Sequence, residues 1–97
     1  MSGIDILGTG CYAPSHTLSN DDLSTMVDTS DEWIYPRTGI KKRHISQTEN
    51  TSELAYQAAK KALENSGVSK EDIGFIIVAT CSADHIMPSV ACMMQTQ

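Results

Sequence analysis

The stretch NTSELAYQAAKKALENSG, from Asn50 to Gly67, constrains the fold more than any other part of this sequence. Its apolar residues recur at helical spacing and form one stripe, made of Leu54, Ala55, Ala58, Ala59, Ala62 and Leu63. Asn50 and Glu53 give a capping-box-like start, and Gly67 stands where a helix commonly ends. The sequence therefore predicts an amphipathic helix over 50–66, whose alanines allow close packing on a sheet.

Two segments that flank this helix in the sequence are predicted to supply the sheet. Residues 3–11 alternate apolar and polar side chains at their start and predict a strand, which Pro14 prevents from continuing. Residues 75–80, FIIVAT, form the continuous apolar run that is typical of a strand buried on both faces. The order strand, helices, strand predicts an α/β layered fold with a parallel sheet.

Two short helices are expected between those segments. Ser19 or Asn20 can cap the first, over 21–27, whose acidic residues suit a helix N-terminus. Thr29 and Glu32 match the T-x-x-E capping box and predict the start of the second.

Other boundaries come from proline and charge. Pro36 is expected to end the second short helix, and IKKRHI, residues 40–45, predicts a short exposed strand. Residues 81–87 are expected to form a loop at the carboxyl end of a strand, where α/β folds usually bind ligands. Pro88 and Ser89 then open a helix over the last residues, VACMMQTQ, which have no cap and no polar tail. The chain is therefore expected to be the opening third of something larger.

Composition excludes several classes of protein. The 97 residues suit one domain or part of one, and 40% hydrophobic with 20% charged residues is ordinary for a globular protein. No membrane-spanning run or signal peptide is recognised, so a cytoplasmic protein is expected. Three widely spaced cysteines predict reduced thiols, and the net charge of −5 argues against nucleic-acid binding.

The glycine-rich GTGCYA, residues 8–13, fits the G-x-G-x-x-A pattern of dinucleotide-binding folds. That site needs a helix opening after Gly10, and Pro14 with the polar residues that follow it argues against one. We favour close backbone packing as the reason for these glycines. A dinucleotide-dependent oxidoreductase remains as an alternative that requires the missing helix.

The segment DTSDEWIYPRTGIKKRHI, residues 28–45, places the only tryptophan beside four of the seven basic residues. Trp33 and Arg37 are four residues apart, so a helical turn would place them on the same side. They could stack an adenine across a gap between them, a contact worth about 1–3 kcal/mol per base. Alternatively, Trp33 packs in the core and Arg37 pairs with Asp31 or Glu32, which spacing alone favours.

The cysteines and histidines are weaker candidates. Cys81 and His85 could form a thiol–imidazole pair on a ligand-facing loop, but a buried free cysteine is the commoner case. Cys92, on the last helix, is expected to pack in the interior. No spacing in the sequence predicts a metal site.

Three groups of motifs resemble β-ketoacyl-acyl-carrier-protein synthase III, an initiating condensing enzyme of the thiolase-fold family. They are the GTG-x-Y-x-P opening, the D-T-S-D-E-W-I-x-x-R-T-G-I stretch and the later I-x-x-A-T-x-S-x-x-x-x-x-P-S-x-A-C. The middle motif is long and specific. The resemblance covers the whole chain, residues 1–97, and implies the N-terminal part of a layered α-β-α-β-α thiolase-like fold.

The resemblance also implies a reaction and partners. Such an enzyme transfers an acyl group from acyl-CoA to a cysteine and condenses it with malonyl-acyl-carrier protein, losing carbon dioxide. It uses the coenzyme A thioester as substrate and no further cofactor, and it is usually a homodimer. The implied nucleophilic cysteine and the C-terminal half lie outside these 97 residues, so no catalytic residue is assigned and the fragment alone is expected to be inactive.

Four positions carry implied binding roles. By resemblance, Trp33 and Arg37 sandwich the adenine of coenzyme A, and Thr29 lies near the same ligand. Met87 takes a position that many bacterial members fill with a phenylalanine closing the partner's acyl pocket across the dimer. The main alternative is a small non-catalytic module that binds adenine nucleotides or carrier protein; such a module should be monomeric and melt cooperatively.

Overall fold

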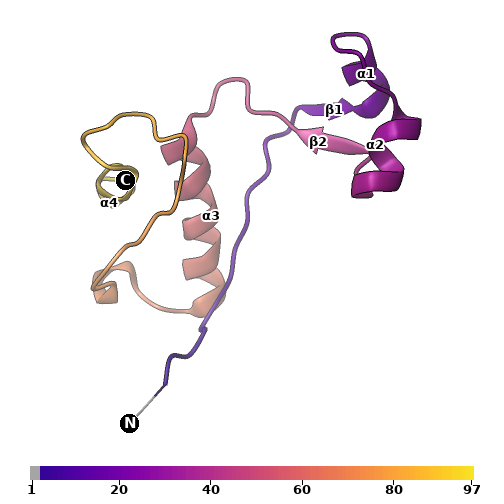
Figure 1. Cartoon of the computed structure of the whole chain (residues 1–97). Helices are drawn as coiled ribbons and strands as arrows, with labels where there is room; N and C mark the ends of the chain where they lie inside the picture. Colours follow the sequence, from indigo (N-terminus) through magenta and orange to yellow (C-terminus); the bar gives the residue numbers. More distant parts are fainter. Residues whose placement is uncertain (1–2) are drawn as a thin grey trace. The chain divides into compact units, whose positions relative to one another are not determined.

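The structure, a computed structural model, describes residues 3–97, and the chain divides into two compact units. The Trp33 unit is Ala13–Thr48, and the α3 unit joins the described residues up to Tyr12 with Glu49–Gln97. Figure 1 traces the chain through both units. Within the described residues, no helix combines the length and the apolar character needed to cross a membrane.

The Trp33 unit contains two short helices, α1 (Asn20–Ser24) and α2 (Asp31–Thr38). Ser19 caps α1 in a full capping box, since its hydroxyl accepts from the Asp22 N–H at 3.0 Å while the Asp22 carboxylate accepts from the Ser19 N–H at 3.0 Å. The expected cap of α2 is wrong by one residue. Ser30, rather than Thr29, accepts the N–H of Trp33, at 3.2 Å.

Pro36 lies inside α2 rather than ending it. The helix continues to Thr38, whose hydroxyl donates to the Ile34 carbonyl at 2.9 Å. Gly39 then ends it in the left-handed conformation, with φ 70°, and its N–H donates to the Tyr35 carbonyl at 2.7 Å. Gly39 therefore ends the helix. Pro36 lacks an N–H and removes one backbone hydrogen bond from α2, but the helix continues past it.

The same unit contains a two-stranded antiparallel sheet. β1 (Thr17–Ser19) pairs with β2 (Lys42–His44), with Leu18 opposite Arg43. The short exposed strand expected over 40–45 is confirmed by β2. It is the only sheet in the described part of the chain, so the expected parallel sheet is not observed.

The α3 unit is built around α3 (Thr51–Ser66), as the sequence predicts. The Asn50 side chain accepts from the Glu53 N–H at 3.3 Å, and Gly67 ends the helix with φ 71°. A 3-10 turn at Lys70–Asp72 follows, and α4 (Val90–Gln95) begins after Ser89, whose hydroxyl accepts from the Cys92 N–H. α4 packs against α3.

The first described residues run extended beside α3 (Figure 1) because two glycines allow close contact. A Cβ on Gly8 would lie 2.8 Å from the Ala62 carbonyl oxygen, and one on Gly10 would lie 2.5 Å from that of Ala58. The predicted close packing of GTGCYA is confirmed. No helix begins directly after Gly10, since the next elements are β1 and then α1 at Asn20, and this contradicts the dinucleotide-binding alternative.

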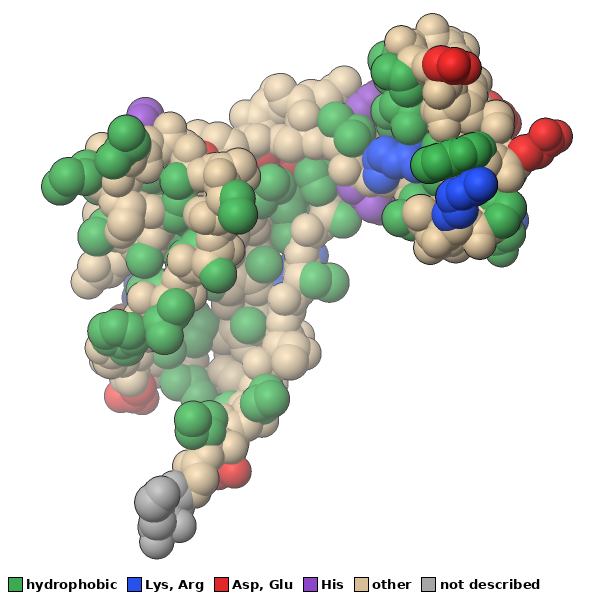
Figure 2. Space-filling view, in the orientation of Figure 1, with side chains coloured by type: hydrophobic (Ala, Val, Ile, Leu, Met, Phe, Trp, Pro, Cys, Tyr) green, Lys and Arg blue, Asp and Glu red, His purple; other side chains and the backbone are tan. Residues whose placement is uncertain are grey.

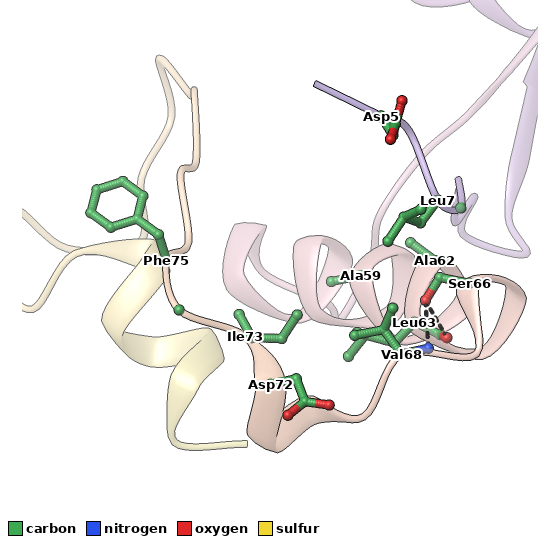
Figure 3. A pocket seen from close by; sticks show the side chains of 12 residues that line it. Asp5, Leu7, Ala59, Ala62, Leu63, Ser66, Val68, Asp72, Ile73 and Phe75 are labelled. Carbon is green, nitrogen blue, oxygen red and sulfur yellow. Dashed lines mark hydrogen bonds between the residues drawn. The ribbon is translucent and has the colours of Figure 1, made fainter. Parts of the chain in front are cut away.

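The two expected core strands are not present. Residues 3–11 and 75–80 have no strand pairing, and Phe75 and Ile77 are 81% and 82% exposed. These segments have the sequence of strands but no hydrogen-bonded neighbour strand among the described residues, so large apolar side chains such as Ile4 and Phe75 stay exposed. Figure 3 shows the open groove, about 460 Å³, that lies beside α3 between Leu7 and Ile73.

Candidate functional site

Helix α2 presents Trp33 and Arg37 on one side, as their spacing predicts. The Cζ atom of Arg37 lies 4.5 Å from the centroid of the indole ring, and one guanidinium nitrogen donates to the Trp33 carbonyl at 2.9 Å. Trp33 is 56% exposed, so the alternative in which it packs in the core is wrong. Arg37 makes a hydrogen bond to the Trp33 carbonyl and a cation–π contact with the indole. It forms no salt bridge with Asp31 or Glu32 in the described part of the chain.

The expected gap between the two side chains is closed. A purine stacked on both faces would need about 7 Å between them, because each carbon contact takes about 3.5 Å. The observed 4.5 Å leaves room for the direct cation–π contact alone. The sandwich inferred from the resemblance is therefore not the arrangement seen here, since the guanidinium already occupies the indole surface that a ligand was expected to fill.

A recess lies beside Trp33. It has a volume of about 400 Å³ and is lined by Asp28, Thr29, Ser30 and Trp33. The structure thus brings Thr29 and Trp33 together, as expected, whereas Arg37 does not line the recess. The volume lies within the range usual for small-molecule sites.

The cationic residues after α2 divide into different roles. Arg43 is a structural residue, since its guanidinium donates to the Leu18 carbonyl at 3.1 Å and to the Asn20 side chain at 2.6 Å. The Lys41 ammonium lies 5.1 Å from the centre of the Tyr35 ring, a second cation–π pair on the same helix. Lys42 is exposed on β2. The cluster is therefore only partly available to an anionic ligand.

Asn20 is a residue whose importance the sequence did not reveal. It is 2% exposed, and its amide bonds three groups: Asp31, the Ile40 carbonyl and Arg43. In the sequence it was only a candidate helix cap. Its partners are 11, 20 and 23 residues away, and no local pattern predicts contacts at such separations.

The loop over 81–88 is tied to the start of α3. The two carboxylate oxygens of Asp84 accept the N–H groups of Thr51 and Ser52, at 2.7 and 3.1 Å, and the Thr51 hydroxyl donates to the Ser82 carbonyl. Hydrogen bonding by Ser52 is the main cause that lowers the pKa of Asp84 below its ordinary 3.8. Met87, in the same loop, is 84% exposed.

The predictions for the cysteines are partly confirmed and partly wrong. Cys11, Cys81 and Cys92 are free thiols, as predicted, but all are exposed, so the expected packing of Cys92 is wrong. α4 is short, and Val90 rather than Cys92 enters the interior, at 3% exposure. Among the described residues, Cys81 makes no hydrogen bond with His85, so the thiol–imidazole pair is not formed.

Comparison with known proteins gives a consistent result. The β-ketoacyl-[acyl-carrier-protein] synthase III of Clostridium acetobutylicum is 54% identical over 95 residues, which are 98% of this chain and 29% of that protein. The enzyme of the same name from Lactococcus lactis is 60% identical over 86 residues, 89% of this chain and 26% of that protein. No protein-family model matches the chain.

Solved structures agree with these sequences. The 3-oxoacyl-[acyl-carrier-protein] synthase III of Aquifex aeolicus matches with a TM-score of 0.93 at 48% identity, covering 97% of this chain and 30% of that one. The priming β-ketosynthase of the R1128 polyketide pathway matches at 0.89 with 32% identity, covering 94% of this chain and 28% of that one. The chain spans about 30% of the length of the curated relatives it matches.

These matches confirm the expected fold class, part of a layered α/β thiolase-like fold, although the predicted strands are unpaired here. The chain is therefore similar, in sequence and in fold, to a segment of the β-ketoacyl-[acyl-carrier-protein] synthase III enzymes.

Proposed function

We propose that this chain is part of an initiating condensing enzyme of type II fatty acid synthesis. In that reaction a cysteine thiolate attacks the thioester carbonyl of acyl-CoA and forms a new carbon–sulfur bond. The carbon–sulfur bond to coenzyme A breaks, and coenzyme A leaves as a thiolate that takes up the proton the cysteine gave up. Loss of carbon dioxide from malonyl-acyl-carrier protein then supplies the carbon nucleophile that attacks the enzyme-bound acyl group and frees the cysteine. The names and the identity of the relatives support this assignment.

The role we assign to this segment is binding of the nucleotide end of coenzyme A. The observation that carries it is the exposed indole of Trp33 at the rim of the recess that Thr29 also lines. Adenine would stack on the indole surface that faces the recess, and Thr29 offers a hydroxyl within it. Arg37 would act from the other side, because its guanidinium holds the indole and its charge favours the phosphates.

The other proposed properties follow from the resemblance. Coenzyme A thioester is the substrate, without a further cofactor, and the working protein is a cytoplasmic homodimer that meets malonyl-acyl-carrier protein. Residues 1–97 would form the N-terminal portion of the first half of such an enzyme. None of the exposed cysteines takes the role of the nucleophile, so these residues alone would bind the nucleotide and catalyse no condensation.

Met87 is proposed to line the acyl pocket across the dimer. Its exposure of 84% suits a side chain that reaches a partner. Methionine is unbranched and flexible, so the pocket should admit longer or branched starter groups than a phenylalanine would allow. In the full-length enzyme, Met87→Phe should shift the ratio of kcat/KM toward acetyl-CoA over branched primers by about tenfold. An unchanged ratio in a folded, active variant would contradict this role.

The nucleotide role can be tested through the single tryptophan of the chain. Because Trp33 is the only indole, its fluorescence reports on the site without interference. Coenzyme A should quench it saturably, whereas pantetheine, which lacks the nucleotide, should leave it unchanged at the same concentration. Equal responses to both compounds, or no response to coenzyme A, would overturn the proposal.

A further inference from the structure

The buried side chain of Asn20 makes hydrogen bonds through both of its polar atoms. Its Nδ2 group donates to the Asp31 carboxylate and to the Ile40 carbonyl, both at 2.7 Å. Its Oδ1 atom accepts from Arg43 at 2.6 Å, and its backbone N–H donates to the Lys41 carbonyl at 2.9 Å. Asn20 is 2% exposed, so these hydrogen bonds take the place of bonds to water.

These bonds reach both ends of one helix. Asp31 is the first residue of α2, and Ile40 and Lys41 follow Gly39, which ends it. Helix α2 has only 8 residues and buries only Ile34. Helices below about 12 residues are marginal in water, so α2 depends on such tertiary anchors for its place and direction.

The chemistry of the partners determines the orientation of the amide. A carboxylate and a carbonyl can only accept, so they must face Nδ2, and a guanidinium can only donate, so it must face Oδ1. An aspartate at position 20 would have the same shape but would turn an oxygen toward the Asp31 carboxylate and the Ile40 carbonyl. The site therefore requires an amide, and not merely a side chain of this size.

The hydrogen bond from Asn20 to Asp31 lies next to residues that line the recess. Asp31 follows Ser30, whose hydroxyl accepts the N–H of Trp33 at 3.2 Å. Ser30 and Trp33 both line the recess. Any tilt of the first turn of α2 would therefore move the indole relative to Thr29.

We propose that Asn20 is a positioning residue for the nucleotide site. By holding α2 at both ends, it fixes the position of Trp33 relative to Thr29 in the recess that both residues line. Asn20 touches no ligand in this scheme and acts only through Asp31, Ile40 and Arg43. The inference rests on the proposed nucleotide role of Trp33, and it names the group that maintains the geometry of that site.

The first test uses Asn20→Asp in the full chain, with coenzyme A as the probe and Trp33 fluorescence as the signal. Asn20→Asp should raise the Kd for coenzyme A by about tenfold or more, because the two hydrogen bonds that Nδ2 donates are lost and an oxygen then repels the Asp31 carboxylate and the Ile40 carbonyl. It should also lower the fluorescence anisotropy of Trp33, since the indole gains freedom. Adding Asp31→Asn should restore part of both signals, because the new amide at 31 can donate to the new carboxylate at 20.

A milder matched pair covers the case in which Asn20→Asp fails to fold. Asp31→Ala and Glu32→Ala each remove one acid from the first turn of α2, but only Asp31 bonds Asn20. Both variants change the charge near the phosphates equally. Asp31→Ala should therefore raise the Kd about fivefold above that of Glu32→Ala, by loss of one charge-assisted bond.

The outcomes separate this inference from the proposed function. If the unaltered chain fails to bind coenzyme A, the nucleotide role fails, and the anisotropy of Trp33 still decides whether Asn20 positions the indole. If the unaltered chain binds, while Asp31→Ala matches Glu32→Ala in Kd and in anisotropy, the positioning role of Asn20 is overturned.

Discussion

At the scale of single residues, the contact between Arg37 and Trp33 changes how a nucleotide would be bound. An exposed cation–π pair is worth about 0.5–1 kcal/mol, whereas a stacked base is worth about 1–3 kcal/mol. An incoming adenine therefore has enough stacking energy to compete for the indole, but it need not displace the arginine while the recess side stays open. In the proposed binding mode, Arg37 would hold the indole in a defined rotamer through their contact.

Asp84 gives a residue-scale prediction about pH. Its pKa is lowered in the folded chain, so the stability that it contributes is present above the ordinary carboxyl pKa of 3.8 and is lost as the pH falls through the lowered value. The melting temperature of the chain should therefore fall on acidification below about pH 4. Asp84→Asn should reduce that acid dependence, measured by circular dichroism.

The control for Asp84 is Glu64→Gln, which neutralises an exposed acid on α3, the helix whose first N–H groups Asp84 accepts. It should leave the acid-induced fall in melting temperature close to that of the unaltered chain. Equal acid dependence in the unaltered chain and in Asp84→Asn would refute the role of Asp84 as a cap of the helix.

Some residues of the site could be predicted, and others could not, for physical reasons. Trp33 and Thr29 come together because they are close in sequence around one helix start. The closed contact of Arg37 depends on rotamers, which spacing does not determine. Asn20 acts through partners that are distant in sequence, so only the folded chain reveals it.

At the scale of elements, the packing of the first segment on α3 depends on Gly8 and Gly10. Alanine at position 10 would place its Cβ 2.5 Å from the Ala58 carbonyl oxygen, and the helix backbone cannot yield. Gly10→Ala should lower the free energy of unfolding by about 1–3 kcal/mol. Gly3→Ala, in the same segment with nothing within 4 Å, should be neutral or slightly stabilising. Denaturant unfolding followed by circular dichroism measures both; equal effects would show that the contact is not maintained.

Helix ends could be predicted better than strands. The ends of α3 at Asn50 and Gly67 depend on side-chain and backbone preferences of nearby residues, and both were found where expected. Strand pairing is a contact between distant segments. Residues 75–80 have the composition of a buried strand, yet composition alone does not supply a partner, and β1 with β2 formed the observed sheet instead.

At the scale of the whole molecule, the described residues expose many large apolar side chains (Figure 2). Ile4 and Ile86 are each 98% exposed, and Phe75 is 81% exposed, while the buried apolar side chains are Ile34 and Val90. So much uncovered apolar surface favours association. The chain alone should therefore sediment as species larger than a monomer at micromolar concentration.

That sedimentation experiment also bears on the alternative of a small binding module. Sedimentation as a monomer, together with one cooperative thermal transition, would favour an independent module over a segment of a condensing enzyme. Replacing Ile4 and Phe75 with threonine should reduce association, if these exposed side chains cause it.

The most direct test of the proposed nucleotide site is a calorimetric titration of coenzyme A into two matched variants. Trp33→Ala and Tyr35→Ala each remove an exposed aromatic ring of α2 that contacts a cation, Arg37 in one case and Lys41 in the other. Only Trp33 lines the recess. Trp33→Ala should weaken binding by about 1–3 kcal/mol, the worth of one stacked base, while Tyr35→Ala should bind as the unaltered chain does. Equal affinities for the two variants would contradict the assignment of the indole to the adenine of coenzyme A.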